Sequence, residues 1–193
     1  MKTINIRKLY RLGCCGLFSF SALCSHATSV DVTFTANIRE TTCDMTIEGG
    51  TGDGTSNTIP IGSNGKLGLD KIANGDSAAQ TDFKLKITEC PSSLQSLKTT
   101  VQGTPSAIVK TAIVNGLSSS DAASYIGVTI ARSNAPDNAF VINSTTDTER
   151  LVWTSSEISS KQVQLIAKLV ETTAGKGTSG PFSALATFNF TYE

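Results

Sequence analysis

The side chains best suited to nucleophilic or metal chemistry in this sequence are five cysteines and a single histidine. Thiolates and imidazoles are common nucleophiles, general bases and zinc ligands of proteins. Most of these residues crowd into the first 27 positions, as Cys14, Cys15, Cys24 and His26. Only Cys43 and Cys90 lie beyond them, so the chemistry open to the chain depends on what becomes of its first segment.

Residues 1–27 have the pattern of a secretory signal peptide. Four basic residues and no acidic ones lie within residues 1–13, the short apolar run "CCGLFSFSALC" follows, and "SHA" supplies small residues before Thr28. We therefore expect export and cleavage after Ala27. The apolar run is shorter than the roughly 20 residues of a membrane span. A lipoprotein signal at Cys24 is the alternative, although Leu23 is bulkier than the small residue such signals resemble.

Cleavage would leave a mature chain of 166 residues, which suits one domain with a sizeable core. This chain keeps 12 of the 16 basic residues and all 16 acidic residues, a net charge of −4, which argues against nucleic acid as a partner. In an oxidising compartment Cys43 and Cys90 are expected to form a disulfide rather than remain two unpaired buried thiols. No histidine remains and the acidic residues show no motif, so we expect no enzymatic activity, no metal and no cofactor.

The sequence finishes on a regular strand pattern. After Gly180 the apolar residues take even positions and the polar residues take odd ones, with Leu185 the exception. This period of two predicts a half-buried β-strand, at a place where chains usually fray. Its apolar face consists of Phe182, Ala184, Ala186, Phe188, Phe190 and Tyr192, and Glu193 follows.

A second alternating segment, "VDVTFTANIRETTC", begins at Val30. Its apolar face consists of Val30, Val32, Phe34, Ala36 and Ile38. From the residues alone two readings stay open: an ordinary first strand of the chain's own sheet, or an extension that must cover something outside its own domain.

Short strands and frequent turns are predicted between these ends. "TDFKLKITEC" alternates up to Cys90, where Pro91 stops it. "GGTGDG" lacks the GK[ST] of a phosphate-binding loop and predicts a flexible hairpin or loop, and "KLGLDKIA" allows no more than one helical turn. Together these features indicate an all-β antiparallel sandwich of immunoglobulin-like type. Further strands are predicted within residues 97–103, 107–115, 125–132, 139–143, 151–154 and 161–171.

The whole mature chain resembles a subunit of the chaperone–usher pilin family, close to the type 1 fimbrial group. The resemblance rests on the signal peptide, the alternating extension, Cys43 just after it and Cys90 closing "FKLKITEC". Gly180 in the fourteenth position from the end and Tyr192 in the second-last complete it. In such pilins the residue seven places before the first cysteine is typically glycine, and here it is Ala36.

The resemblance implies an incomplete immunoglobulin-like β-sandwich that lacks its final strand and is completed by donor-strand exchange. Residues 28–40 would be the donor-strand extension and residues 41–193 the pilin domain. The C-terminal strand, with the carboxylate of Glu193, would be the edge that a periplasmic chaperone covers before a neighbouring subunit's extension replaces the chaperone strand. The implied partners are this chaperone, an outer-membrane usher and neighbouring pilin subunits.

The resemblance further implies a structural subunit of a fimbria on the bacterial cell surface, exported through the periplasm and contributing to adhesion. A tip adhesin that binds carbohydrate is the alternative, but such adhesins resemble two joined domains without a donor extension. A secreted β-sandwich enzyme is the third reading, and the missing histidine counts against it. Trp153 in "LVWT" would be a sugar-stacking residue in an adhesin, whereas a lone strand tryptophan is more often part of the core.

Overall fold

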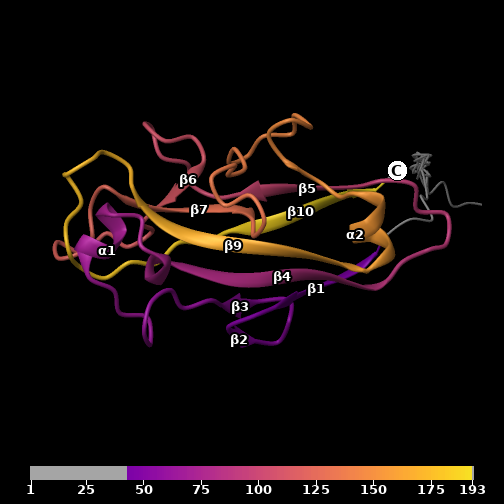
Figure 1. The fold of residues 1–193 in the computed structure, drawn as a ribbon, viewed down its shortest axis with the longest axis horizontal. Helices are drawn as coiled ribbons and strands as arrows, with labels where there is room; N and C mark the ends of the chain where they lie inside the picture. The colour runs from indigo at the N-terminus through magenta and orange to yellow at the C-terminus, as the bar shows by residue number, and fades with distance from the viewer. Residues whose placement is uncertain (1–42, 193) are drawn as a thin grey trace, which may run out of the picture. The chain divides into compact units, whose positions relative to one another are not determined.

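The structure is a computed structural model that describes residues 43–192. Within this range the chain forms short strands with little helix (Figure 1). The helical segments are α1 (Leu69–Ala73), the 3-10 turn η1 (Ser77–Ala79) and α2 (Ser155–Ser159). The strands are β1 (Asp44–Glu48), β2 (Thr51–Gly52), β3 (Asn57–Thr58), β4 (Gln80–Glu89), β5 (Leu97–Gln102), β6 (Ala112–Val114), β7 (Ile126–Arg132), β8 (Leu151–Val152), β9 (Gln162–Glu171) and β10 (Thr187–Tyr192).

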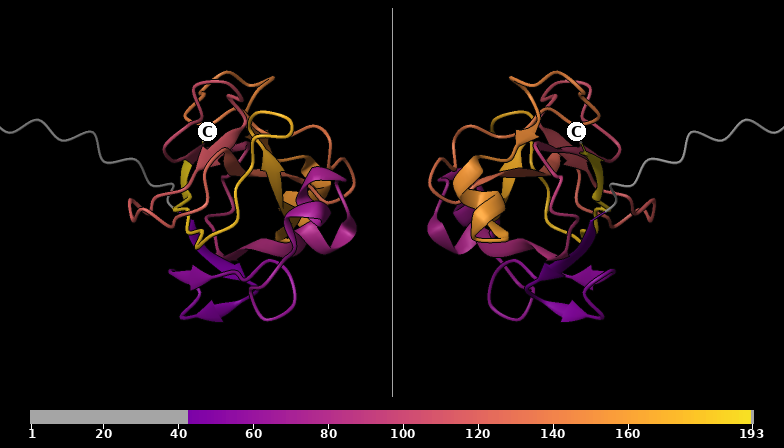
Figure 2. Two further views of the ribbon diagram at one scale, coloured as in Figure 1. Left: turned by 90° about the vertical axis from the view of Figure 1, so that its left-hand side faces the viewer. Right: turned by 90° about the vertical axis from the view of Figure 1, so that its right-hand side faces the viewer.

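Two antiparallel sheets form the sandwich. One has the order β1-β4-β9-β7-β6 and the other has the order β10-β5-β8, while β2 and β3 pair only with each other as a hairpin. The end-on views in Figure 2 show the two layers with the hairpin beside β1. The predicted all-β immunoglobulin-like sandwich is therefore confirmed.

The core lies between the sheets and follows from the alternation of each strand. In β4 the apolar residues Phe83, Leu85 and Ile87 are buried, and the lysines between them are more exposed. Leu85 faces the same interior as Leu97 of β5 and Leu165 of β9, all three fully buried. A period of two puts these side chains on one face of each sheet, and burial of each one stabilises the fold by roughly 1.5–3 kcal/mol.

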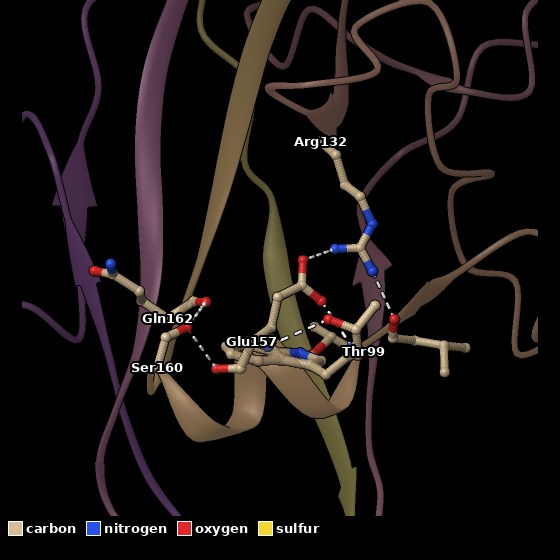
Figure 3. Close-up of polar contacts among 8 residues, drawn as sticks. Thr99, Arg132, Glu157, Ser160 and Gln162 are labelled. Atoms are coloured by element: carbon tan, nitrogen blue, oxygen red, sulfur yellow. Dashed lines mark hydrogen bonds and ion pairs between the residues drawn. The ribbon is translucent and has the colours of Figure 1, made fainter.

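Polar contacts join the two sheets near β8 (Figure 3). Arg132, the last residue of β7, donates to the carbonyl oxygen of Val152 at 2.6 Å and pairs with Glu157 of α2. Glu157 also completes a capping box with Thr154, which explains a short helix that the sequence pattern did not predict. Trp153 is 4% exposed and donates from Nε1 to Thr99 Oγ1 at 2.9 Å, so it belongs to the core.

The prediction of a strand within residues 139–143 is wrong. This segment is irregular, although its side chains Phe140 and Ile142 are buried in the core. The amide of Phe140 donates to the carbonyl of Ile130, and the amide of Ile142 donates to that of Lys110, so successive amides bond to different parts of the chain. The alternation of apolar residues here correctly indicated buried side chains, but it did not indicate a strand of a sheet.

The disulfide joins Cys43 to Cys90 and so ties the start of β1 to the end of β4, with 4.3 Å between the Cα atoms. We expect the double change Cys43→Ser and Cys90→Ser to lower the free energy of unfolding by about 4 kcal/mol, because the bond closes a loop of 47 residues. Urea unfolding followed by the fluorescence of buried Trp153 measures this loss. An unchanged midpoint, or ready alkylation of both native thiols without reductant, would contradict the prediction.

Candidate strand-binding groove

Two strand edges face the same side of the sandwich. In the described residues β1 pairs only with β4, and β10 pairs only with β5. Each therefore keeps one edge along which main-chain N–H and C=O groups point away from its own sheet. Such an edge is a template for pairing with another strand.

The apolar face of β10 and of the residues before it is only half covered. The residues of even number are half-buried, and those of odd number are exposed, including Leu185 at 79%. Phe188 packs against Phe83 of the core with ring centroids 5.9 Å apart. The half-buried set, which packs against the core from its open side, is Phe182, Ala184, Ala186, Phe188, Phe190 and Tyr192.

A groove of about 320 Å³ lies between the two edges. Its β1 wall is formed by Met45 and Ile47, its β10 wall by Phe188 and Phe190, and the fully buried Leu85 reaches it from β4. A further wall is the rim Gly54–Asn57, which belongs to the β2–β3 hairpin. The arrangement exposes core side chains between the outer edges of β1 and β10, where an added strand with one apolar face fits.

Tyr192 links the two edges at one end. Its hydroxyl donates to the carbonyl oxygen of Cys43 at 3.1 Å, which connects the last described residue of β10 to the residue before β1. Burial is the main cause that raises the pKa of the Tyr192 hydroxyl above its usual value. The hydroxyl therefore stays protonated and able to donate at neutral pH.

The hairpin rim is the part of the groove that the sequence pattern did not reveal. Asp53 closes the turn by accepting from the amides of Thr55 and Ser56 at 2.8 and 2.7 Å, and from the Thr55 hydroxyl at 2.7 Å. An Asp three residues before a serine in a glycine-rich stretch is a signal for such a turn. The sequence predicted a flexible hairpin or loop, and the structure contains a hydrogen-bonded hairpin.

Asp53 predicts a pH dependence of this turn. The hydrogen bond from the Ser56 amide is the largest cause that lowers the pKa of the Asp53 carboxyl, to about 2. Because an unfolded aspartate has a pKa of about 3.9, the contribution of this carboxylate is complete above pH ~4 and is lost as the pH falls towards ~2. NMR titration of the carboxyl carbon and of the Ser56 amide tests this. A midpoint near 4 for both signals would show that the turn does not hold the charged form.

Several predicted residues lie outside the described range. These are the signal peptide, the extension face of Val30, Val32, Phe34, Ala36 and Ile38, and the terminal Glu193. Their roles stay predictions. Of the residues predicted for the C-terminal face, Ala186, Phe188 and Phe190 line the groove, whereas Phe182, Ala184 and Tyr192 pack against the core outside its lining.

Neither a metal centre nor a membrane span is found in the part of the chain that the structure describes. No group of three or more His, Cys, Asp or Glu side chains in residues 43–192 is placed to hold a metal ion. No helix in the same range has the length and apolar character needed to cross a bilayer.

Comparison with known proteins places the chain in a family. The family model described as "Fimbrial protein" matches residues 32–193. The fimbrial-like protein YadM of Escherichia coli K12 is 38% identical over 172 residues, which cover 86% of this chain and 88% of YadM. The chain therefore belongs to the fimbrial protein family, and its resemblance to type 1 fimbrial-like pilins is confirmed.

The fold comparison agrees with the sandwich described above. The crystal structure of the P pilus rod subunit PapA superposes with a TM-score of 0.52 at 17% identity and covers 84% of this chain and 100% of PapA. At this level of identity the likeness concerns the fold.

Proposed function

We propose that this chain is a non-catalytic structural subunit of a surface fimbria and that it polymerises by donor-strand exchange. The observation that carries the proposal is the groove between β1 and β10, which leaves two strand edges and half-covered core side chains facing the same space. A complete sandwich would fill this space with a strand of its own. In the polymer the extension of a neighbouring copy or subunit fills it instead.

The extension has the composition that the groove requires. Val30, Val32, Phe34 and Ile38 share one face of a period-two segment. Burial of four such side chains contributes on the order of 6–12 kcal/mol before the cost of ordering the segment, and main-chain hydrogen bonds to β10 add to it. This range is sufficient for a durable joint between subunits.

The proposed organisation is a signal peptide in residues 1–27, the donor extension in residues 28–40 and the pilin domain in residues 41–193. A periplasmic chaperone would cover the β10 edge until an outer-membrane usher passes the subunit to the growing fibre. The fibre would contribute to adhesion of the bacterial cell. This sequence of steps is what the resemblance to chaperone–usher pilins implies, and the aggregation hazard of an exposed apolar edge is consistent with it.

Isolation from the periplasm with mass measurement tests the proposed class. We expect the mature chain, cut after Ala27, to co-purify with a chaperone in a one-to-one complex. Recovery of a stable, uncomplexed monomer under the same conditions would contradict the proposal, because an open groove should not survive unprotected.

A further inference from the structure

The outer edge of β1 offers two residues to an added strand. Opposite residues of β1 and β4 are Met45 with Ile87 and Ile47 with Leu85. The Ile87 amide donates to the carbonyl of Lys161, on the side of β4 away from β1. Met45 and Ile87 are therefore a non-hydrogen-bonded pair of the antiparallel ladder, in which both residues turn their main-chain groups away from each other. This orientation repeats at every second residue along the strand. Met45 and Ile47 therefore point their main-chain groups away from β4.

At Ile47 this edge is already occupied by the chain's own hairpin. The Ile47 amide donates to the carbonyl of Gly54 at 2.6 Å. The side-chain amide of Asn57 donates to the Ile47 carbonyl at 3.1 Å and to the Gly49 carbonyl at 2.8 Å. Both outward groups of Ile47 thus have partners within the subunit.

Asn57 fixes the hairpin in this position. Besides its two donated bonds, its side-chain oxygen accepts from the amide of Gly54 at 2.8 Å. One side chain therefore links both ends of the turn to the end of β1. The link between β1 and the hairpin also leaves little room for change, because Gly50 has a φ of 66° and a Cβ atom there would collide with the carbonyl of Thr58.

From these contacts we propose that the β2–β3 hairpin, held by Asn57, limits how a strand can enter the groove. An entering strand adds to β10 along its length. It can form main-chain hydrogen bonds to β1 only at Met45, because the outward N–H and C=O groups of Ile47 are already bonded to the hairpin. Asn57 is thus a positioning residue for strand capture. The inference rests on the proposed function, since it specifies how the groove binds its strand. It adds that the groove disfavours strands that require main-chain hydrogen bonds to both β1 and β10.

Residue-resolved amide exchange tests this with the full mature chain, released from its chaperone in denaturant and refolded in dilute solution immediately before each measurement, with and without a synthetic peptide of residues 28–42. In the unaltered chain we expect peptide to slow exchange at β10 and at Met45, while Ile47 is protected with or without it. Asn57→Ala removes the side-chain bonds that hold Gly54 beside Ile47, so it should loosen the bond from the Ile47 amide to the Gly54 carbonyl. Exchange at Ile47 should then be about tenfold faster without peptide, since a hydrogen bond contributes about 0.5–1.5 kcal/mol and 1.4 kcal/mol is a factor of ten. Added peptide should then restore its protection.

Asn138→Ala is the matched control, because Asn138 is an exposed asparagine on the loop after β7. It should leave Ile47 exchange unchanged. Protection of Ile47 that appears only when peptide binds the unaltered chain would overturn the inference, as would an Asn57→Ala variant that exchanges like the control. Failure of peptide to protect β10 in any variant would instead overturn the proposed function, while the peptide-free comparison still judges the role of Asn57.

Discussion

Removal of Thr191, Tyr192 and Glu193 is expected to abolish chaperone capture and to leave the chain to aggregation or degradation. The deletion shortens β10, whose free edge forms one side of the groove. It also removes the hydroxyl of Tyr192 that bonds to the carbonyl of Cys43. By the family resemblance, it would further remove the terminal carboxylate that a chaperone is expected to hold. Periplasmic accumulation and co-purification with the chaperone measure the effect.

Tyr192→Phe separates the parts of this prediction. It keeps the length of β10 and the aromatic face but deletes the hydroxyl. It should therefore lower the free energy of unfolding by about 1 kcal/mol and leave chaperone capture intact. A truncated chain that accumulates normally and still co-purifies with a chaperone would show that the end of β10 is not the binding edge.

The second large effect is expected at Ala36, the smallest residue on the apolar face of the extension. Ala36→Phe should block incorporation into fibres while export, the disulfide and chaperone binding stay normal. The reason is that a large side chain entering a close-packed groove costs about 1–3 kcal/mol or more before the strand can seat. Because type 1 pilins typically have glycine here, the groove that receives this residue is expected to be shallow. The measurement is the yield of denaturant-resistant polymers sheared from the cell surface.

Thr35→Phe is the control for this change. Thr35 has the opposite parity to Ala36, so its side chain belongs to the polar face of the same strand. It should assemble at a normal level. Equal polymer yields for Ala36→Phe and the unaltered chain would show that position 36 does not enter a restrictive pocket.

The sequence was informative wherever a strand keeps one face buried. The alternation in β4 and after Gly180 predicted which side chains pack inward, because a period of two leaves little freedom in register. The pairing of Cys43 with Cys90 also followed from the sequence, since export leaves no other cysteine for either to bond.

The sequence could not reveal features that depend on tertiary contacts. Phe140 and Ile142 are as apolar as strand residues, yet their amides bond to two different segments and no strand forms. The Asn57 side chain makes three hydrogen bonds, two to the carbonyls of Ile47 and Gly49 and one to the amide of Gly54. In the sequence, however, a lone asparagine after a glycine-rich stretch is indistinguishable from an ordinary turn residue.

The groove between β1 and β10 is proposed to receive the extension of another subunit. The most direct test of this proposal adds the peptide of residues 28–42 to the purified complex of the mature chain with its chaperone and follows the masses of all species over time. We expect free chaperone to appear together with a one-to-one complex of subunit and peptide. A chaperone complex that persists unchanged, with this peptide and with the extensions of the neighbouring fimbrial subunits, would contradict the proposal.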